Sequence, residues 1–131
     1  MTKILLVEDS KFLRLATERA LFRAGYAVRS AVDGEQALGI AREWVPDLIL
    51  LDMMLPKMSG LDVMKALKSD SKTAAIPVVI ISGLSQKNAE RLQADGAFAF
   101  LEKSELGLDK GMEVLLSAVG EIIRRLVYRE V

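Results

Sequence analysis

Five short apolar runs recur at fairly even spacing along the chain, and four of them are continuous rather than alternating with polar residues. Continuous apolar runs of this length are typical of strands that are covered on both faces of a sheet. The pattern therefore predicts strands at residues 4–7, 26–28, 48–51, 78–81 and 97–101.

The segments between these runs carry apolar residues at helical spacing, with one face recurring every three or four positions. These faces predict helices around residues 13–24, 37–41, 61–67 and 112–126. Turn and capping residues agree with these limits: Gly25 ends the first helix, and Asp33 with Gln36 forms a capping box for the second. Pro46 and Pro77 precede strands, and Ser85 is a cap for a further helix ending at residues 95–96.

Strands that alternate with helices imply an α/β fold with a parallel sheet. Right-handed crossovers leave few topologies for five strands, and the common doubly wound order, counted along the chain, is 2-1-3-4-5. The 131 residues contain no low-complexity run or internal linker, so we expect a single domain over residues 1–131.

Acidic residues follow two of the predicted strands at the place where this topology puts functional sites. In a doubly wound sheet the site lies outside the carboxyl ends of the strands where the strand order reverses, here between strands one and three. Glu8 and Asp9 end the first strand and Asp52 ends the third, while Ser82 and Lys103 end the fourth and fifth. Two carboxylates about 4 Å apart repel by about 4 kcal/mol at an effective dielectric of 20, so such a cluster needs a proton, a cation or a metal.

The composition narrows the chemistry of that cluster. The chain has no Cys and no His, which excludes thiolate nucleophiles, imidazole bases and the usual zinc sites. An all-oxygen site suits Mg²⁺, and a carboxylate held beside Mg²⁺ and an ammonium is able to attack phosphorus. Lys and Arg balance Asp and Glu at 18 each, so no overall charge favours nucleic acid or an anionic membrane.

Each of these residues also has an ordinary structural interpretation. Asp9 and Ser10 suit a helix N-cap, Asp52 suits a turn, Ser82 suits a loop, and a terminal Lys103 is commonly solvated. Their occurrence together at the ends of four strands favours the functional interpretation. No apolar run is long enough for a membrane span or an export signal, so we expect the protein to stay in the cytoplasm.

Taken together, these residues closely resemble the receiver domain of two-component response regulators, which has a flavodoxin-like fold. The resemblance covers essentially the whole chain and is carried by residues 5–10 (LLVEDS), 47–60 (DLILLDMMLPKMSG), 79–83 (VIISG) and 97–103 (AFAFLEK).

The resemblance implies that Asp52 accepts a phosphoryl group from the phosphohistidine of a sensor kinase or a histidine phosphotransfer protein. It implies that Glu8 and Asp9 hold Mg²⁺ together with Asp52 and the backbone carbonyl of Met54. Such a domain is a signalling switch rather than an enzyme with steady turnover.

The resemblance also assigns the residues of a switch. Ser82 is similar to the switch hydroxyl, Phe100 to the switch aromatic that rotates inward, and Lys103 to the phosphate-contacting lysine. The responding surface would comprise the fourth helix, fifth strand and fifth helix. It would control a downstream effector or a fused output domain, with a homodimer on phosphorylation left open.

Three positions depart from the family pattern. Ser104 stands where proline usually follows the lysine, so we predict a trans Lys103–Ser104 bond, because a cis bond without proline costs about 3 kcal/mol. Met54 and Leu84 are apolar at positions that influence the attacking water, which predicts slow loss of the phosphoryl group.

Other proteins with this kind of sheet fit the residues less well. A haloacid-dehalogenase-type phosphatase, our alternative, would place a second Asp where Met54 stands, and a flavin carrier would place a phosphate-binding loop where Glu8 and Asp9 stand. Nucleotide-binding glycine motifs are absent from the sequence. The arginines near the end of the chain complement the last helix dipole and do not indicate nucleic-acid binding.

Overall fold

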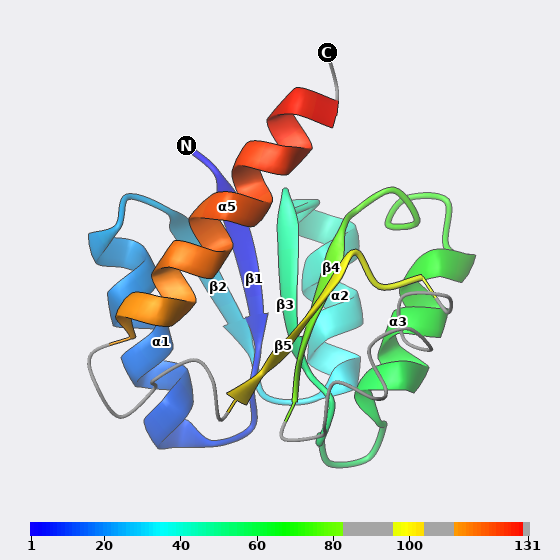
Figure 1. Cartoon of the computed structure of the whole chain (residues 1–131). Helices are drawn as coiled ribbons and strands as arrows, with labels where there is room; N and C mark the ends of the chain where they lie inside the picture. The colour runs from blue at the N-terminus through cyan, green and yellow to red at the C-terminus, as the bar shows by residue number, and fades with distance from the viewer. Residues whose placement is uncertain (83–95, 104–111, 130–131) are drawn as a thin grey trace.

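The fold is a five-stranded parallel sheet in the order β2-β1-β3-β4-β5, as predicted. We describe it from a computed structural model that covers residues 1–82, 96–103 and 112–129 (Figure 1). The predicted helix between Ser85 and Gly96, the side chain of Leu84 and the Lys103–Ser104 bond lie outside the described residues. The strands are β1 (Lys3–Val7), β2 (Ala27–Ala31), β3 (Leu48–Asp52), β4 (Val78–Ser82) and β5 (Ala99–Glu102).

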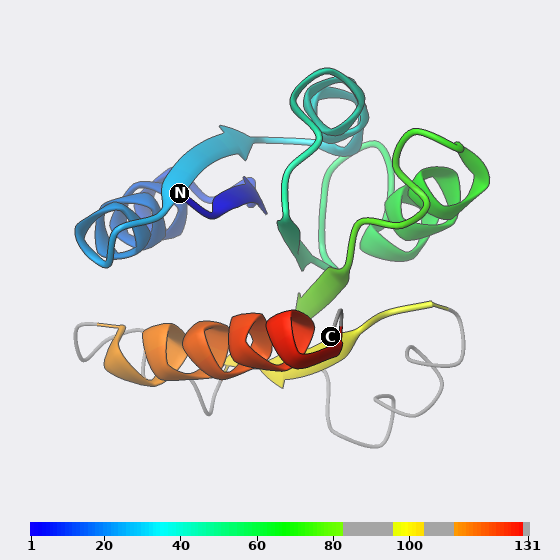
Figure 2. The ribbon, with the colours of Figure 1, turned by 90° about the horizontal axis from the view of Figure 1, so that it is seen from above.

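Helices cover both faces of the sheet, which is the doubly wound arrangement. Figure 2 shows α1 (Lys11–Arg23) and α5 (Glu113–Arg129) on one face, and α2 (Gly34–Trp44) and α3 (Gly60–Ser69) on the other. Within these described segments, no helix is long and apolar enough to cross a membrane.

Successive strand residues point to opposite faces and so divide the core into two clusters. Leu5 and Val7 of β1 pack in the cluster that contains buried residues of α2 and α3. Ile4 and Leu6 pack in the cluster that contains Leu21 of α1 and buried residues of α5. This two-sided burial explains why the strand runs are continuous, and each fully buried Leu or Ile stabilises the fold by about 1.5–3 kcal/mol.

The helix starts confirm the predicted caps, although α1 and α2 begin two and three residues before the predicted apolar faces. Ser10 caps α1 by accepting from the Leu13 amide, and Asp33 caps α2 by accepting from the Gln36 amide at 2.9 Å. The Gln36 side chain reaches the Val32 amide instead of that of Asp33, so the predicted capping box is only half formed. The end of α1 is also confirmed, because Gly25 follows it with φ +100°, a conformation that favours glycine.

The single tryptophan, at the end of α2, contacts residues of the strands β1 and β2. The Lys3 ammonium donates to the Trp44 carbonyl at 2.7 Å and lies 5.3 Å from the centre of its ring. The Arg29 guanidinium lies 4.9 Å from the same ring, which adds a second cation–π contact.

Candidate functional site

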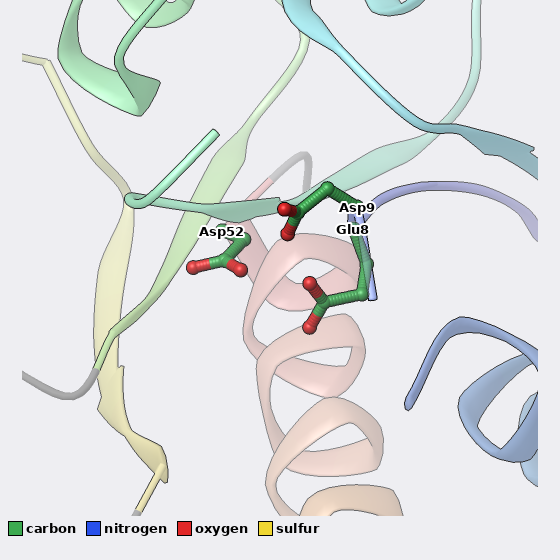
Figure 3. Close-up of side chains that lie close together, drawn as sticks. All are labelled: Glu8, Asp9 and Asp52. Atoms are coloured by element: carbon green, nitrogen blue, oxygen red, sulfur yellow. The ribbon is translucent and has the colours of Figure 1, made fainter. Parts of the chain in front are cut away.

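Three carboxylates meet at the carboxyl end of the central strands, as the strand order requires. Glu8 and Asp9 follow β1, Asp52 is the last residue of β3, and one oxygen from each lies within 4.8 Å of the others (Figure 3). Glu8 and Asp52 are buried, whereas Asp9 is exposed at the rim. The cluster is therefore anchored in the protein on one side and open to solvent on the other.

Lys103, which follows β5, supplies the positive charge of the cluster. Its ammonium lies 3.0 Å from Asp52 Oδ2 and 3.4 Å from Glu8 Oε1, so one cation bridges two carboxylates from different strands. The lysine side chain is only partly exposed, which strengthens these contacts relative to a surface pair.

Backbone groups fix the direction of the acidic side chains. The Met54 amide donates to Asp52 Oδ1 at 3.1 Å, and the Ser10 amide donates to Glu8 Oε2 at 3.3 Å. Arg14 of α1 donates to the carbonyls of Glu8 and Asp9, so the first turn of α1 holds this loop.

The close carboxylates repel one another, and this repulsion shifts the pKa values of the cluster. Burial, together with a hydrogen bond and charge from Asp52, raises the pKa of Glu8 to about 7 despite the opposing effect of Lys103. For Lys103, burial lowers the pKa, but the hydrogen bonds and charges of Asp52 and Glu8 outweigh burial and raise it overall. A divalent cation would relieve this repulsion.

The donor set fits Mg²⁺. All three acidic side chains offer hard oxygen atoms, they converge within one small volume, and the exposed side leaves room for water ligands.

Comparison with known proteins identifies the family that the sequence resembles. The response regulator receiver domain family matches residues 4–115. The chain belongs to this family. A haloacid-dehalogenase-type phosphatase is not supported, and a receiver domain is part of two-component signalling rather than an enzyme of the usual kind.

Individual relatives of this receiver domain differ in size. A gliding motility regulatory protein of Myxococcus xanthus is 42% identical over 92% of this chain, but the chain spans only 15% of that protein. The polar-differentiation response regulator DivK of Brucella ovis is 35% identical over 92% of this chain and 99% of its own length. The solved structure of the chemotaxis response regulator CheY4 of Vibrio cholerae superposes with a TM-score of 0.83 at 30% identity, covering 93% of this chain and 98% of that one.

The two predicted switch residues of the receiver domain lie on neighbouring strands. Ser82 is fully buried at the end of β4, next to the position paired with Asp52. Phe100 pairs with Ile80 in register and is 7% exposed, packed in the cluster of α2 and α3. The ring is thus already inside in this structure, whereas the resemblance implied that it turns inward on activation.

Some contributors to the receiver site were not predicted from the sequence. Gly60 is the first residue of α3 and lies so close to β3 that an added Cβ would be 2.7 Å from the Asp52 carbonyl oxygen. The capping box formed by Ser59 and Asp62, which sets this helix start, was detectable as Ser followed three residues later by Asp. The contacts of Arg14 with backbone carbonyls carried no comparable sequence signal.

Glu8→Gln should stabilise the metal-free receiver domain at pH 8 but not at pH 4.5. Between 4.5 and about 7 the folded protein holds a proton on Glu8 that the unfolded chain has released, so the free energy of unfolding of wild type falls as pH rises through this range. The Gln side chain does not titrate, so at pH 8 the free energy of unfolding of the variant should exceed that of wild type by up to about 3 kcal/mol. Urea titrations in a chelator at both pH values measure it, with Glu43→Gln on α2 as an exposed control; an equal effect at both pH values would contradict the assignment.

Proposed function

We propose that residues 1–131 act as a single phosphoacceptor domain in which Asp52 takes a phosphoryl group from a phosphohistidine, in a reaction that requires Mg²⁺. The donor is a sensor histidine kinase or a histidine phosphotransfer protein. One observation carries the proposal: the buried Asp52 carboxylate is held between the Met54 amide and the Lys103 ammonium, within reach of Glu8 and Asp9.

The reaction is a direct displacement at phosphorus. An oxygen of Asp52 forms the new P–O bond while the P–N bond to the donor imidazole breaks, and the imidazole nitrogen leaves with the bond's electron pair and takes up a proton. Lys103 neutralises a phosphoryl oxygen, and Ser82 donates its hydroxyl to another. Glu8, Asp9, Asp52 and the carbonyl of Met54 would hold the ion.

The added phosphoryl group supplies the driving force for a switch. It brings about 1.5–2 negative charges and three strong acceptors. Turning a domain from 1% to 99% active requires a preference of about 5.5 kcal/mol, which a few charge-assisted hydrogen bonds can provide. Ser82 would transmit the change through β5, where the Phe100 ring already lies inside, to the surface that includes β5 and α5, and so to a downstream effector or output domain.

Intact mass spectrometry with a small-molecule phosphodonor tests the proposal. With acetyl phosphate and Mg²⁺ the protein should gain the mass of one phosphoryl group, and with acetyl phosphate and a chelator it should not. The modified peptide should contain Asp52. Modification elsewhere, or labelling that is independent of Mg²⁺, would overturn the assignment.

Met54→Asn should shorten the lifetime of the acyl phosphate. The Met54 side chain is 72% exposed beside the acidic cluster and has no group that can hold a water molecule in line with phosphorus. An amide at this position can accept and donate hydrogen bonds to such a water, so decay should accelerate several-fold. Decay is followed by mass spectrometry after removal of the donor, with Met54→Leu as the matched control; equal lifetimes for both variants would refute the explanation.

A further inference from the structure

Two consecutive residues, Glu8 and Asp9, direct their carboxylates to the same side of the chain, toward Asp52 (Figure 3). In an extended strand, successive side chains point to opposite faces. The chain must therefore turn where it leaves β1, between Val7 and Ser10, for both acids to reach one ion. The convergence of the two acids thus depends on the groups that hold this turn.

The Arg14 guanidinium binds both carbonyl groups of the turn. Its Nη1 atom lies 3.2 Å from the carbonyl oxygen of Glu8 and 3.3 Å from that of Asp9. Because Nη1 carries two N–H groups, it is able to donate to both oxygens at once. Successive carbonyls of an extended strand also point in opposite directions, so their approach to one nitrogen requires the same turn that brings the carboxylates together.

Glu8 and Asp9 differ in what else holds them. The Glu8 carboxylate accepts from the Ser10 amide and lies 3.4 Å from the Lys103 ammonium. Asp9 is exposed, and in the described part of the chain its carboxylate has no hydrogen bond or ion pair. The direction of the Asp9 side chain is therefore set by its backbone, to which Arg14 is bonded.

We propose that Arg14 is a positioning residue of the metal site: through the carbonyls of Glu8 and Asp9 it holds the turn that directs both carboxylates to Mg²⁺, and so it sets the affinity for the ion. The inference rests on the proposed function, because it concerns the same metal site. Replacing a group that orients metal ligands typically weakens metal binding by about 10–100-fold. We therefore expect loss of the guanidinium to weaken Mg²⁺ binding at least about tenfold.

The charge of Arg14 gives this effect a sign that separates it from simple electrostatics. A positive side chain repels an incoming cation, so removal of the charge alone would tighten Mg²⁺ binding. Removal of the two hydrogen bonds frees the turn and weakens binding instead. Arg14→Met removes both, whereas Arg14→Lys keeps the charge and loses the planar guanidinium that reaches two carbonyls. Both variants should bind Mg²⁺ more weakly than wild type.

Electron paramagnetic resonance measures the affinity through the signal of free Mn²⁺, with Mg²⁺ as the competitor, because Mn²⁺ suits the same oxygen ligands. Both Arg14 variants should require at least about tenfold more of either ion than wild type. The matched control is Arg19→Met, which removes the same charge from an exposed position further along α1. Its affinity should stay within about twofold of wild type, because salt screens an exposed charge.

Two further measurements separate positioning from folding and from an effect on Asp52. Circular dichroism and urea denaturation in a chelator check the fold, since a role in folding alone would lower the free energy of unfolding and leave metal affinity unchanged. Labelling of Arg14→Met by acetyl phosphate should be slow at limiting Mg²⁺ and should recover when Mg²⁺ is raised to saturation, because Asp52 keeps its contacts with the Met54 amide and Lys103.

Each outcome decides between the inference and the function on which it rests. Arg14 variants that bind the ions as tightly as wild type, or more tightly, would overturn the inference and leave the proposed function standing. Labelling that stays slow at saturating Mg²⁺ would show that Arg14 acts on Asp52 rather than on the ion, and would also overturn it. Wild type that binds neither ion would overturn the Mg²⁺ requirement of the proposed function, and the inference with it.

Discussion

Asp52→Asn should abolish acyl phosphate formation while leaving the fold intact. An amide nitrogen or oxygen at this position cannot form the mixed anhydride, so labelling by acetyl phosphate with Mg²⁺ should fall to background, a loss of at least about 100-fold. The substitution removes one of three crowded negative charges and keeps an acceptor for the Met54 amide, so the free energy of unfolding should not fall. Intact mass measures the labelling and urea denaturation measures the stability.

The matched control sits at the other end of the same strand region. Asp47 precedes β3 and accepts from the Lys3 amide at 2.8 Å, far from the cluster. Asp47→Asn should label like wild type. If the Asp52 variant still gains one phosphoryl group, the phosphoacceptor lies elsewhere and the mechanism proposed for this site is wrong.

Gly60→Ala should lower both the free energy of unfolding and the rate of phosphorylation. The new methyl group would lie 2.7 Å from the Asp52 carbonyl oxygen and 2.7 Å from Met53 Cα, and these backbone atoms cannot rotate away. The end of β3 must move, which should reduce the free energy of unfolding by about 1–3 kcal/mol. The displaced Asp52 should then react about tenfold to 100-fold more slowly with acetyl phosphate.

Gly39→Ala is the opposite case and serves as its control. Gly39 lies exposed within α2, and an added Cβ would meet nothing within 4 Å. Alanine there should raise the free energy of unfolding by about 0.5–1 kcal/mol and leave labelling unchanged. Equal stabilities for the two glycine variants would show that the close approach at Gly60 does not constrain β3.

The sheet was predictable because burial on both faces leaves continuous apolar runs, but the strand limits were less so. β2 extends to Ala31 rather than Val28, since it is an edge strand in which the exposed Arg29 interrupts the apolar run. β5 begins at Ala99 rather than Ala97 because its residue pairing with β4 begins at Ala99, opposite Val79. Register and hydrogen bonds, not hydropathy, set these limits.

The acidic cluster was predictable in outline because strand order alone brings Glu8 and Asp52 to one edge. Its electrostatic balance was not, because it depends on distances. Lys103 could have pointed to solvent, and only its 3.0 Å and 3.4 Å contacts show that it bridges two acids. The close approach of Gly60 is likewise a property of packing between elements that sequence spacing does not reveal.

Trp44 gives the protein a built-in optical reporter. The indole is the only one in the chain and contacts Lys3 and Arg29 near the amino edge of the sheet, about one strand length from Asp52. Its fluorescence will change when the fold comes apart and the two cations leave the ring. Phosphorylation at the opposite edge should leave the emission almost unchanged, so unfolding can be followed in the same sample in which labelling of Asp52 is tested.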